Sequence, residues 1–532
     1  MMTRTVLTAA IAASLALPLT LDGQTKAAPA ANAKAATLTA LDYVEIQQLV
    51  ARYPFAVDTG GNNGYDYADL FTSDGEFMRP YSKGREQLAA LARGGTLGPT
   101  NTVHYITNHV IEPTSEGAIG REYLFELGPP QPQGARGGGG GQPANGWDIV
   151  GRKAAELART GGHYEDVYMK TAQGWRFKRR EFIPSRSGMT PAALDPPRIP
   201  ADLPKDAVPG AEQAASFVSP TKQTTLTALD YVQIGQLVAS YGHALDSGFG
   251  KGENGEAYAN LYTPDAEFAG ASGHAALADL ARIQPRGPEF VRHYLTNHVI
   301  EPMPGGAKGK EYLVVLDISE TGMPGSIFLA GHYEDTYVRT ADGWRFKTRR
   351  LFPARPGPQQ TQNAAGAAAA PSFVAAPAAK SALSADDYLA IQQLVAKASY
   401  AIDRLDDGGR AFASLFTPDA RLRAPGVDAK GRDSLAAFAA REPGSRGPLY
   451  VHEFVADHVI QSAAPRSASG RVYAVGLRIA EGETPGAIEN GGHFEDTYVK
   501  TADGWRIKSR TYVPSKLGPR EKWFWAPPAK AN

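Results

Sequence analysis

Cysteine is absent from the 532-residue chain, which excludes disulfide bonds, thiolate-ligated zinc and a thiol nucleophile. An excess of either charge is absent as well, since 55 lysines and arginines balance 55 aspartates and glutamates. Nucleic acids and anionic membranes are therefore not expected partners, because both attract proteins with a basic excess. Histidine, carboxylate, tyrosine and basic side chains remain for chemistry, and the expected partner is a small molecule.

Long apolar runs are lacking beyond the N-terminus. There, residues 6–21 form an apolar run behind Arg4, and small residues at 27–30 resemble a cleavage site. We interpret residues 1–30 as the signal peptide of an exported bacterial protein, periplasmic or secreted, without membrane contact after cleavage. An uncleaved membrane anchor is the alternative, for which the run is short.

Three copies of one unit make up most of the chain. The segment LTALDYVEIQQLVARY at 38–53 returns as LTALDYVQIGQLVASY at 226–241 and as LSADDYLAIQQLVAKA at 383–398. Each copy is far longer than a solenoid repeat, so we expect three tandem domains joined by linkers rich in proline and alanine. The expected division is a signal peptide at 1–30, domains at 38–186, 224–355 and 381–518, linkers at 187–223 and 356–380, and a tail at 519–532.

Each copy is expected to begin with a helix, because a capping box precedes apolar residues at helical spacing. In copy one the box pairs Thr39 with Asp42, and shorter helices are expected at 65–71 and 84–93. Strands are then predicted near 102–112, 121–127, 162–170 and 174–183. Helices followed by antiparallel strands give the fold class α+β, in which the helices cover one face of a curved, mostly antiparallel sheet.

An aspartate stands near the predicted C-terminal end of the first helix in every copy, at Asp58, Asp246 and Asp403. The helix dipole disfavours a negative charge at this end, so a partner should compensate for it. A solvated turn residue before glycine is the alternative interpretation. A strand that carries histidine supplies the candidate partner.

Alternation on the strand near 102–112 places His104 and Asn108 on one face and His109 on the other, with the same pattern in copy two. Both faces carry apolar residues, so the pattern leaves open which face points inward. The alternative for His109 and its repeats is a hydrogen-bonded core histidine. A metal site is not expected, because a five-residue separation on one strand points the two rings apart.

Short motifs in these copies resemble a known family. They are ALD at 244–246, HYxTN at 104–108 and 293–297, and DGWRFK at 342–347. Together they resemble the SnoaL-like branch of the nuclear transport factor 2-like superfamily. The strand motif is most similar to hexachlorocyclohexane dehydrochlorinase and, more distantly, to bile acid 7α-dehydratase and scytalone dehydratase. The resemblance implies a cone-shaped α+β barrel with a deep pocket and, in the members that catalyse elimination, an Asp–His dyad.

Carried over to this sequence, the resemblance implies two catalytic dyads, Asp58 with His104 and Asp246 with His293. The imidazole would act as a general base, and proton abstraction beside a leaving group needs no cofactor. The resemblance also implies that a basic residue of the penultimate strand assists the leaving group. Asparagines on the histidine strand could donate to a developing charge, as could tyrosines one turn before the aspartate, for which a core position is the alternative. These substrate-binding candidates are Lys170, Arg339, Lys500, Asn108, Asn297, Tyr53 and Tyr241.

Copy three departs from this pattern. Alignment from His458 puts Glu453 and Asp457 where the other copies carry the dyad histidine and the asparagine. A one-residue bulge would instead keep His452 in register, as the catalytic partner of Asp403. The absence of a clear dyad leaves two expectations for copy three, a degenerate site or binding without catalysis.

The expected function is that of an exported, cofactor-independent lyase or isomerase, which cleaves a carbon–oxygen or carbon–halide bond of a small apolar substrate or moves a proton within it. The alternative is a non-catalytic periplasmic ligand-binding or assembly protein built from the same domains. Linkers of roughly 25 and 37 residues can span ~80 Å, so they permit an intramolecular pseudotrimer. Three independent domains on spacers are the alternative arrangement.

Overall fold

The computed structural model describes residues 37–95, 103–127, 158–184, 226–246, 255–282, 291–317, 326–353, 383–404, 406–440, 451–464, 466–478 and 487–514. The predicted signal peptide, both predicted linkers and the predicted tail lie outside these ranges. Within the ranges, none of the helices is long and apolar enough to cross a membrane.

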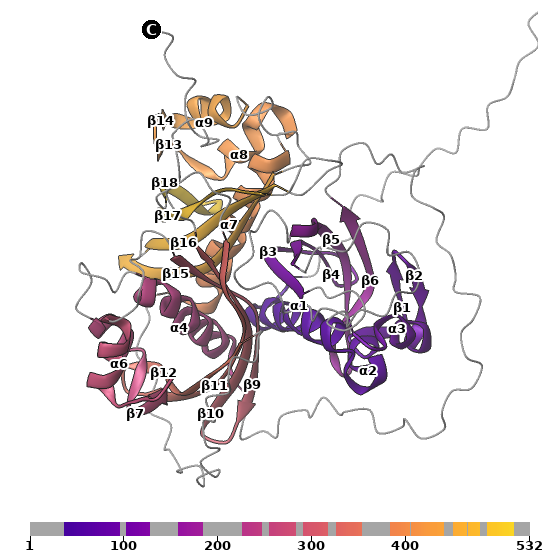
Figure 1. Cartoon of the computed structure of the whole chain (residues 1–532). Helices are drawn as coiled ribbons and strands as arrows, with labels where there is room; N and C mark the ends of the chain where they lie inside the picture. Colours follow the sequence, from indigo (N-terminus) through magenta and orange to yellow (C-terminus); the bar gives the residue numbers. More distant parts are fainter. Residues whose placement is uncertain are drawn as a thin grey trace, which may run out of the picture.

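Each repeat folds into helices packed beside a six-stranded sheet (Figure 1). Domain 1 consists of α1 (Ala40–Thr59), a 3-10 turn (Gly61–Gly64), α2 (Tyr65–Ala68), β1 (Phe71–Met78), β2 (Tyr81–Lys83), α3 (Gly84–Ala92), β3 (Val103–Pro113), β4 (Ala118–Leu127), β5 (Ala158–Thr171) and β6 (Gly174–Pro184). Domain 2 consists of α4 (Ala228–Asp246), α5 (Glu256–Ala259), β7 (Tyr262–Phe268), β8 (Ala271–Ser272), α6 (His274–Arg282), β9 (Val291–Met303), β10 (Gly306–Asp317), β11 (Ser326–Thr340) and β12 (Gly343–Pro353). Domain 3 consists of α7 (Ala385–Arg404), a 3-10 turn (Asp406–Gly409), α8 (Arg410–Ser414), β13 (Phe416–Ala424), β14 (Val427–Lys430), α9 (Gly431–Ala440), β15 (Val451–Ala464), β16 (Ser467–Arg478), β17 (Ala487–Thr501) and β18 (Gly504–Pro514).

The predicted fold class, α+β, is confirmed. The strand order in domain 1 is β2-β1-β6-β5-β4-β3, and only the β1–β6 pair among these neighbours is parallel. The sheet of the cone-shaped domain that the resemblance implied is open, with β2 and β3 at its edges. The helix predicted at 65–71 is shorter in the structure, because the chain enters strand β1 at Phe71. The sequence pattern does not predict β1, since this strand contains Asp74 and Gly75, two residue types that are depleted in strands.

The first helix holds Asp58 in a fixed place. Thr39 caps α1 through the expected capping box with Asp42. Gly60 then ends the helix in the left-handed conformation, at φ 61°, which glycine adopts without steric cost. Asp58 therefore lies in the last turn of α1, where it is fully buried rather than a solvated turn residue.

A bulge reverses the side-chain alternation of β3. Asn108 has a positive φ of 56°, and the pairing with β4 shifts by one residue between Thr107 and Val110. His109 consequently joins His104 on the inner face, where its Nε2 lies 3.0 Å from the hydroxyl of Tyr168 in the domain core. The expectation that Asn108 shares the face of His104, with His109 opposite, is wrong, because a bulge adds one residue to the period of two. The same positive φ recurs at Asn297 and Asp457.

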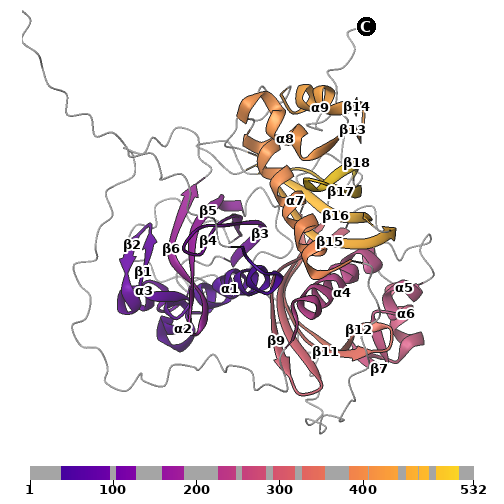
Figure 2. The same cartoon turned by 180° about the vertical axis from the view of Figure 1, so that it is seen from behind.

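One glutamine in each first helix connects that domain to the next. Gln48 of α1 donates through Nε2 to the carbonyl of His298, at 3.0 Å, and accepts from the amide of Ile300, at 2.6 Å. Both partners lie on β9 of domain 2. The equivalent bonds join Gln236 to His458 and Ile460 of β15, and Gln393 to His109 and Ile111 of β3. The contacts run from domain 1 to 2, from 2 to 3 and from 3 back to 1, with β3, β9 and β15 at the centre (Figure 2).

Candidate active site

The helix-end aspartate and the strand histidine meet in domains 1 and 2. His104 Nδ1 lies 2.6 Å from Oδ1 of Asp58, and the backbone amide of His104 donates to Oδ2 at 3.1 Å. In domain 2 the corresponding distances from His293 to Asp246 are 2.6 and 3.0 Å. These donors compensate for the unfavourable helix dipole at each carboxylate. All four residues are buried, and His293 is 8% exposed.

A tyrosine from the next domain donates a further hydrogen bond to the aspartate of each dyad. The hydroxyl of Tyr312, on β10 of domain 2, donates to Oδ2 of Asp58 in domain 1 at 3.0 Å. Tyr473, on β16 of domain 3, donates to Oδ2 of Asp246 in domain 2 at 2.8 Å. Each dyad is therefore built from two domains, and its carboxylate is held by an imidazole, a backbone amide and a phenol.

Replacing Tyr473 by phenylalanine is expected to destabilise domain 2 by about 1.5–3 kcal/mol, since a hydrogen bond to a buried carboxylate is lost. Hydrogen exchange of peptides from α4 and β9 measures the effect. Tyr105→Phe is the matched control, because Tyr105 is equally buried and its hydroxyl has no partner among the described residues. Equal destabilisation by the two substitutions would show that the bond from Tyr473 to Asp246 contributes nothing.

Domain 1 adds a second carboxylate to its histidine. Glu126, opposite His104 in the β3–β4 pairing, places Oε1 3.1 Å from Nε2 of the ring. Burial alone would lower the pKa of His104, but the Asp58 and Glu126 carboxylates raise it well above the ordinary value. Both ring nitrogens thus face carboxylates, an arrangement that favours the imidazolium form and opposes uptake of a substrate proton.

Domain 2 lacks this second carboxylate. Val315 stands opposite His293 in the β9–β10 pairing, at the position of Glu126. Burial raises the pKa of Asp246, but the His293 ring and its hydrogen bond outweigh burial and lower that pKa below its ordinary value. The ionised carboxylate accepts the Nδ1 proton of His293, so Nε2 is the nitrogen that is available to accept a proton.

Domain 3 carries neither arrangement. Asp457 has the positive φ of the bulge, so Glu453, four residues earlier, occupies the position of His104 and His293. Ser399 donates to Oε1 of Glu453 at 2.9 Å. The bulge that would keep His452 in register as the dyad histidine is not the one observed, and the side chains of Asp403 and His452 lie outside the described residues.

The predicted tyrosines and the predicted asparagines lie in different surroundings. Tyr53 and Tyr241 lie edge-on to the dyad histidines, with ring centroids 6.4 and 6.2 Å apart. Their hydroxyls bond to Tyr164 and Tyr333. Asn108 and Asn297 instead bond to the backbone of the neighbouring domain, at Glu453 and Val455 and at His104 and Ile106. These asparagines form hydrogen bonds between domains and do not face the dyads.

The predicted basic residues lie far from the dyads. Lys170 pairs with Asp42 in the first turn of α1, where the indole of Trp175 also donates to Asp42. Sixteen residues of helix separate Asp42 from Asp58, about 24 Å at 1.5 Å per residue. Arg339 and Lys500 make the same pairing with Asp230 and Asp387. The three basic side chains therefore pair with aspartates at the start of the first helices. They do not lie beside the dyads, where a leaving group would be.

An open, curved sheet with a long helix against one face defines a fold of the nuclear transport factor 2-like type. The sequence profile of the SnoaL-like domain matches residues 38–181, 226–350 and 384–511. The chain therefore belongs to the SnoaL-like domain family, with three copies of the domain in tandem. No curated protein sequence matches the chain.

Solved structures resemble single domains of this chain. An NTF2-like protein with a cystatin-like fold from Novosphingobium aromaticivorans is 22% identical, with 24% of this chain and 82% of that chain covered and a TM-score of 0.22. A protein of unknown function with a cystatin-like fold from Nostoc punctiforme is 20% identical, with 26% and 97% covered and a TM-score of 0.23. A provisionally assigned scytalone dehydratase from Novosphingobium aromaticivorans is 23% identical, with 24% and 82% covered and a TM-score of 0.20.

Proposed function

We propose that domain 2 is the catalytic centre of a cofactor-independent lyase or isomerase, in which His293 removes a proton from a small, mainly apolar substrate. The observation that carries this proposal is the bond between Asp246 and Nδ1 of His293, with Val315 in place of the opposing glutamate. Fixed in this tautomer, the imidazole is a competent base near neutral pH, and the carboxylate stabilises the imidazolium that forms.

In an elimination the substrate proton moves to Nε2 of His293. The electron pair of the broken carbon–hydrogen bond forms a carbon–carbon double bond, and the leaving group departs with the electrons of its own bond. An isomerisation returns the proton to a different carbon. The His293 ring lies edge-on to Tyr241, whose ring in turn contacts Phe268 and Tyr333, and this aromatic surround favours an apolar substrate.

Paired substitutions in the two domains test the proposal. In a screen of alicyclic halides, alcohols and β,γ-unsaturated ketones, His293→Gln is expected to lower turnover by about 10²–10⁴-fold, the usual contribution of a general base. His104→Gln is the matched control and is expected to retain turnover within a few fold, since the Asp58 and Glu126 carboxylates favour the protonated form of His104. Turnover that survives His293→Gln would refute the assignment.

The second candidate is a non-catalytic ligand-binding or assembly protein. The observation that favours it is the loss of the histidine in domain 3, where Glu453 takes its place. Binding of a compound from the same screen without any product, equally in the native chain and in His293→Gln, would select this candidate over the enzyme.

We also propose that the protein is exported, to a bacterial periplasm or beyond. The apolar run behind Arg4 and the small residues at 27–30 support this proposal. Cell fractionation followed by N-terminal sequencing is expected to yield a chain cleaved near residue 30 outside the cytoplasm. A cytoplasmic chain that begins at residue 1 would contradict it.

A further inference from the structure

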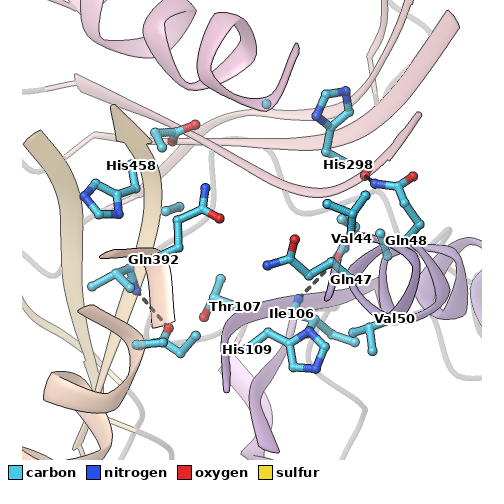
Figure 3. A pocket seen from close by; sticks show the side chains of 18 of the residues that line it. Val44, Gln47, Gln48, Val50, Ile106, Thr107, His109, His298, Gln392 and His458 are labelled. Carbon is cyan, nitrogen blue, oxygen red and sulfur yellow. Dashed lines mark hydrogen bonds between the residues drawn. The ribbon is translucent and has the colours of Figure 1, made fainter. Parts of the chain in front are cut away.

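A cavity of about 290 Å³ lies where the three domains meet (Figure 3). Its walls come from α1, α4 and α7 and from the strands β3, β9 and β15, so every domain contributes to it. Aliphatic side chains form much of the wall, among them Val44, Val232 and Val395. A cavity of roughly 150 Å³ suffices to hold benzene, so this one has room for a substituted ring.

Polar groups enter this apolar space at a few points. Gln47 of α1 and Gln392 of α7 point toward one another across it (Figure 3). Thr107 of β3 also lines the cavity; it is 9% exposed, and its hydroxyl has no hydrogen-bond partner among the described residues. A buried hydroxyl without a partner costs free energy, which a ligand that bonds to it would recover.

Gly235 makes the cavity asymmetric. It occupies, in α4, the position of Gln47 and Gln392 in the other two first helices. A Cβ atom built on Gly235 would meet nothing within 4 Å, so a side chain there would enter open space. Glycine is a poor helix former, and its presence in the middle of α4 keeps open a volume that a third glutamine would fill.

Burial favours the uncharged forms of the titratable groups that line the cavity. Burial lowers the pKa of His109, His298 and His458 to about 3. Burial raises the pKa of Asp457 well above the ordinary value. A charged ligand would therefore lose its hydration without gaining an ionic partner, which favours an uncharged one.

We propose that this axial cavity is a second ligand site, distinct from the dyads, that binds a small, uncharged, mainly apolar molecule with one hydroxyl or carbonyl group. The size and polarity fit a monocyclic alcohol. The ligand's polar group bonds to Thr107 and to the glutamine amides, and its ring packs on the aliphatic wall and over Gly235. Because all three domains line the site, an occupied cavity holds the domains together.

Titration of cyclohexanol into the full chain, followed by calorimetry, tests the site. We expect one equivalent to bind. Gly235→Gln, which installs the residue of the other two repeats, is expected to weaken binding by more than about tenfold, since even one additional methylene in a filled pocket has an effect of that size. His293→Gln is expected to leave binding unchanged, which separates this site from the proposed catalytic one.

Thr107→Val gives an independent measurement, because it keeps the shape of the side chain and removes the hydroxyl. It is expected to weaken cyclohexanol binding by about three- to tenfold and to leave binding of methylcyclohexane unaltered. The proposal is overturned if cyclohexanol does not bind to the native chain, or if Gly235→Gln binds it as tightly as the native chain does. Loss of binding in His293→Gln would instead assign the probe to the proposed catalytic site and would also overturn the proposal.

Discussion

Replacing Val315 by glutamate is expected to lower turnover in domain 2 by about 10²–10⁴-fold, as much as loss of the base itself. Val315 faces His293 across two paired strands, as Glu126 faces His104 in domain 1. A carboxylate at this position would hold Nε2 as Glu126 does, and would keep the imidazole protonated at neutral pH. His293 would still be present, but it would already be protonated and could not act as a base.

The pH dependence identifies the cause of this loss. A histidine whose pKa is raised regains its basic form only as the pH rises, so the activity of Val315→Glu should recover at alkaline pH. Val315→Gln is the matched control, because it fills the same space without introducing a charge beside the His293 ring. If both variants lose the same activity with the same pH profile, steric obstruction and not protonation is responsible.

The reciprocal change should release the histidine of domain 1. Glu126→Val removes one of the two carboxylates that raise the pKa of His104, so the ring should titrate at a lower pH than in the native domain. Nitrogen chemical shifts of the imidazole report this titration. In a chain that also carries His293→Gln, activity that reappears with Glu126→Val would show that Glu126 alone silences the first dyad.

The repeated motifs predict the parts of the site that lie within one domain. The capping box fixes where α1 begins, and the helix end and the strand motif together place Asp58 near His104. The bulge at Asn108 escapes this reasoning, because alternation assumes a period of two along the whole strand. Asparagine is among the residues that tolerate a positive φ, so its recurrence beside the histidine was a signal of a bulge.

The contacts between domains could not be predicted from the sequence. Tyr312 and Tyr473 recur at one position of the repeat, at Tyr123 in the first copy, yet recurrence does not tell which domain a side chain contacts. Lys170 illustrates the opposite error, since its expected role came from the resemblance alone. The capping aspartate Asp42, which also accepts from the Trp175 indole, instead holds Lys170 at the start of α1.

The three repeats share backbone features around the dyad position but differ in the side chains there. These features are shared, because each first helix carries an aspartate in its last turn and each edge strand bulges at the same point. The groups around the imidazole position differ: glutamate in domain 1, valine in domain 2 and no histidine in domain 3. Domain 3 nevertheless supplies Tyr473 to the dyad of domain 2, so a repeat without a dyad still supports a site elsewhere.

A buried arginine of domain 2 packs against the tyrosine that contacts the dyad histidine. The Arg349 side chain is 0% exposed, pairs with Glu311 and Asp335, and lies 4.0 Å from the ring centroids of Tyr241 and Tyr333. Burial raises the pKa of Glu311 well above its ordinary value, and Asp335 raises it further. The cation therefore holds together a cluster that would be unstable without it, directly beneath the tyrosine that packs on His293.

Arg349→Met is expected to destabilise domain 2 by about 3–5 kcal/mol, because breaking a buried ion pair leaves uncompensated carboxylates. A carboxyl whose folded pKa is raised binds its proton more tightly in the folded state, so stability falls as the pH rises above about 4.5. The deficit should thus be larger at pH 7 than at pH 5, as measured by hydrogen exchange of peptides from β10 to β12. Glu311→Val is the control, since domain 3 carries Val472 at this position and its Arg510 pairs with Asp496. This substitution should destabilise domain 2 much less. A loss below about 1 kcal/mol in Arg349→Met would mean that the aromatic packing, rather than the ion pair, holds this cluster together.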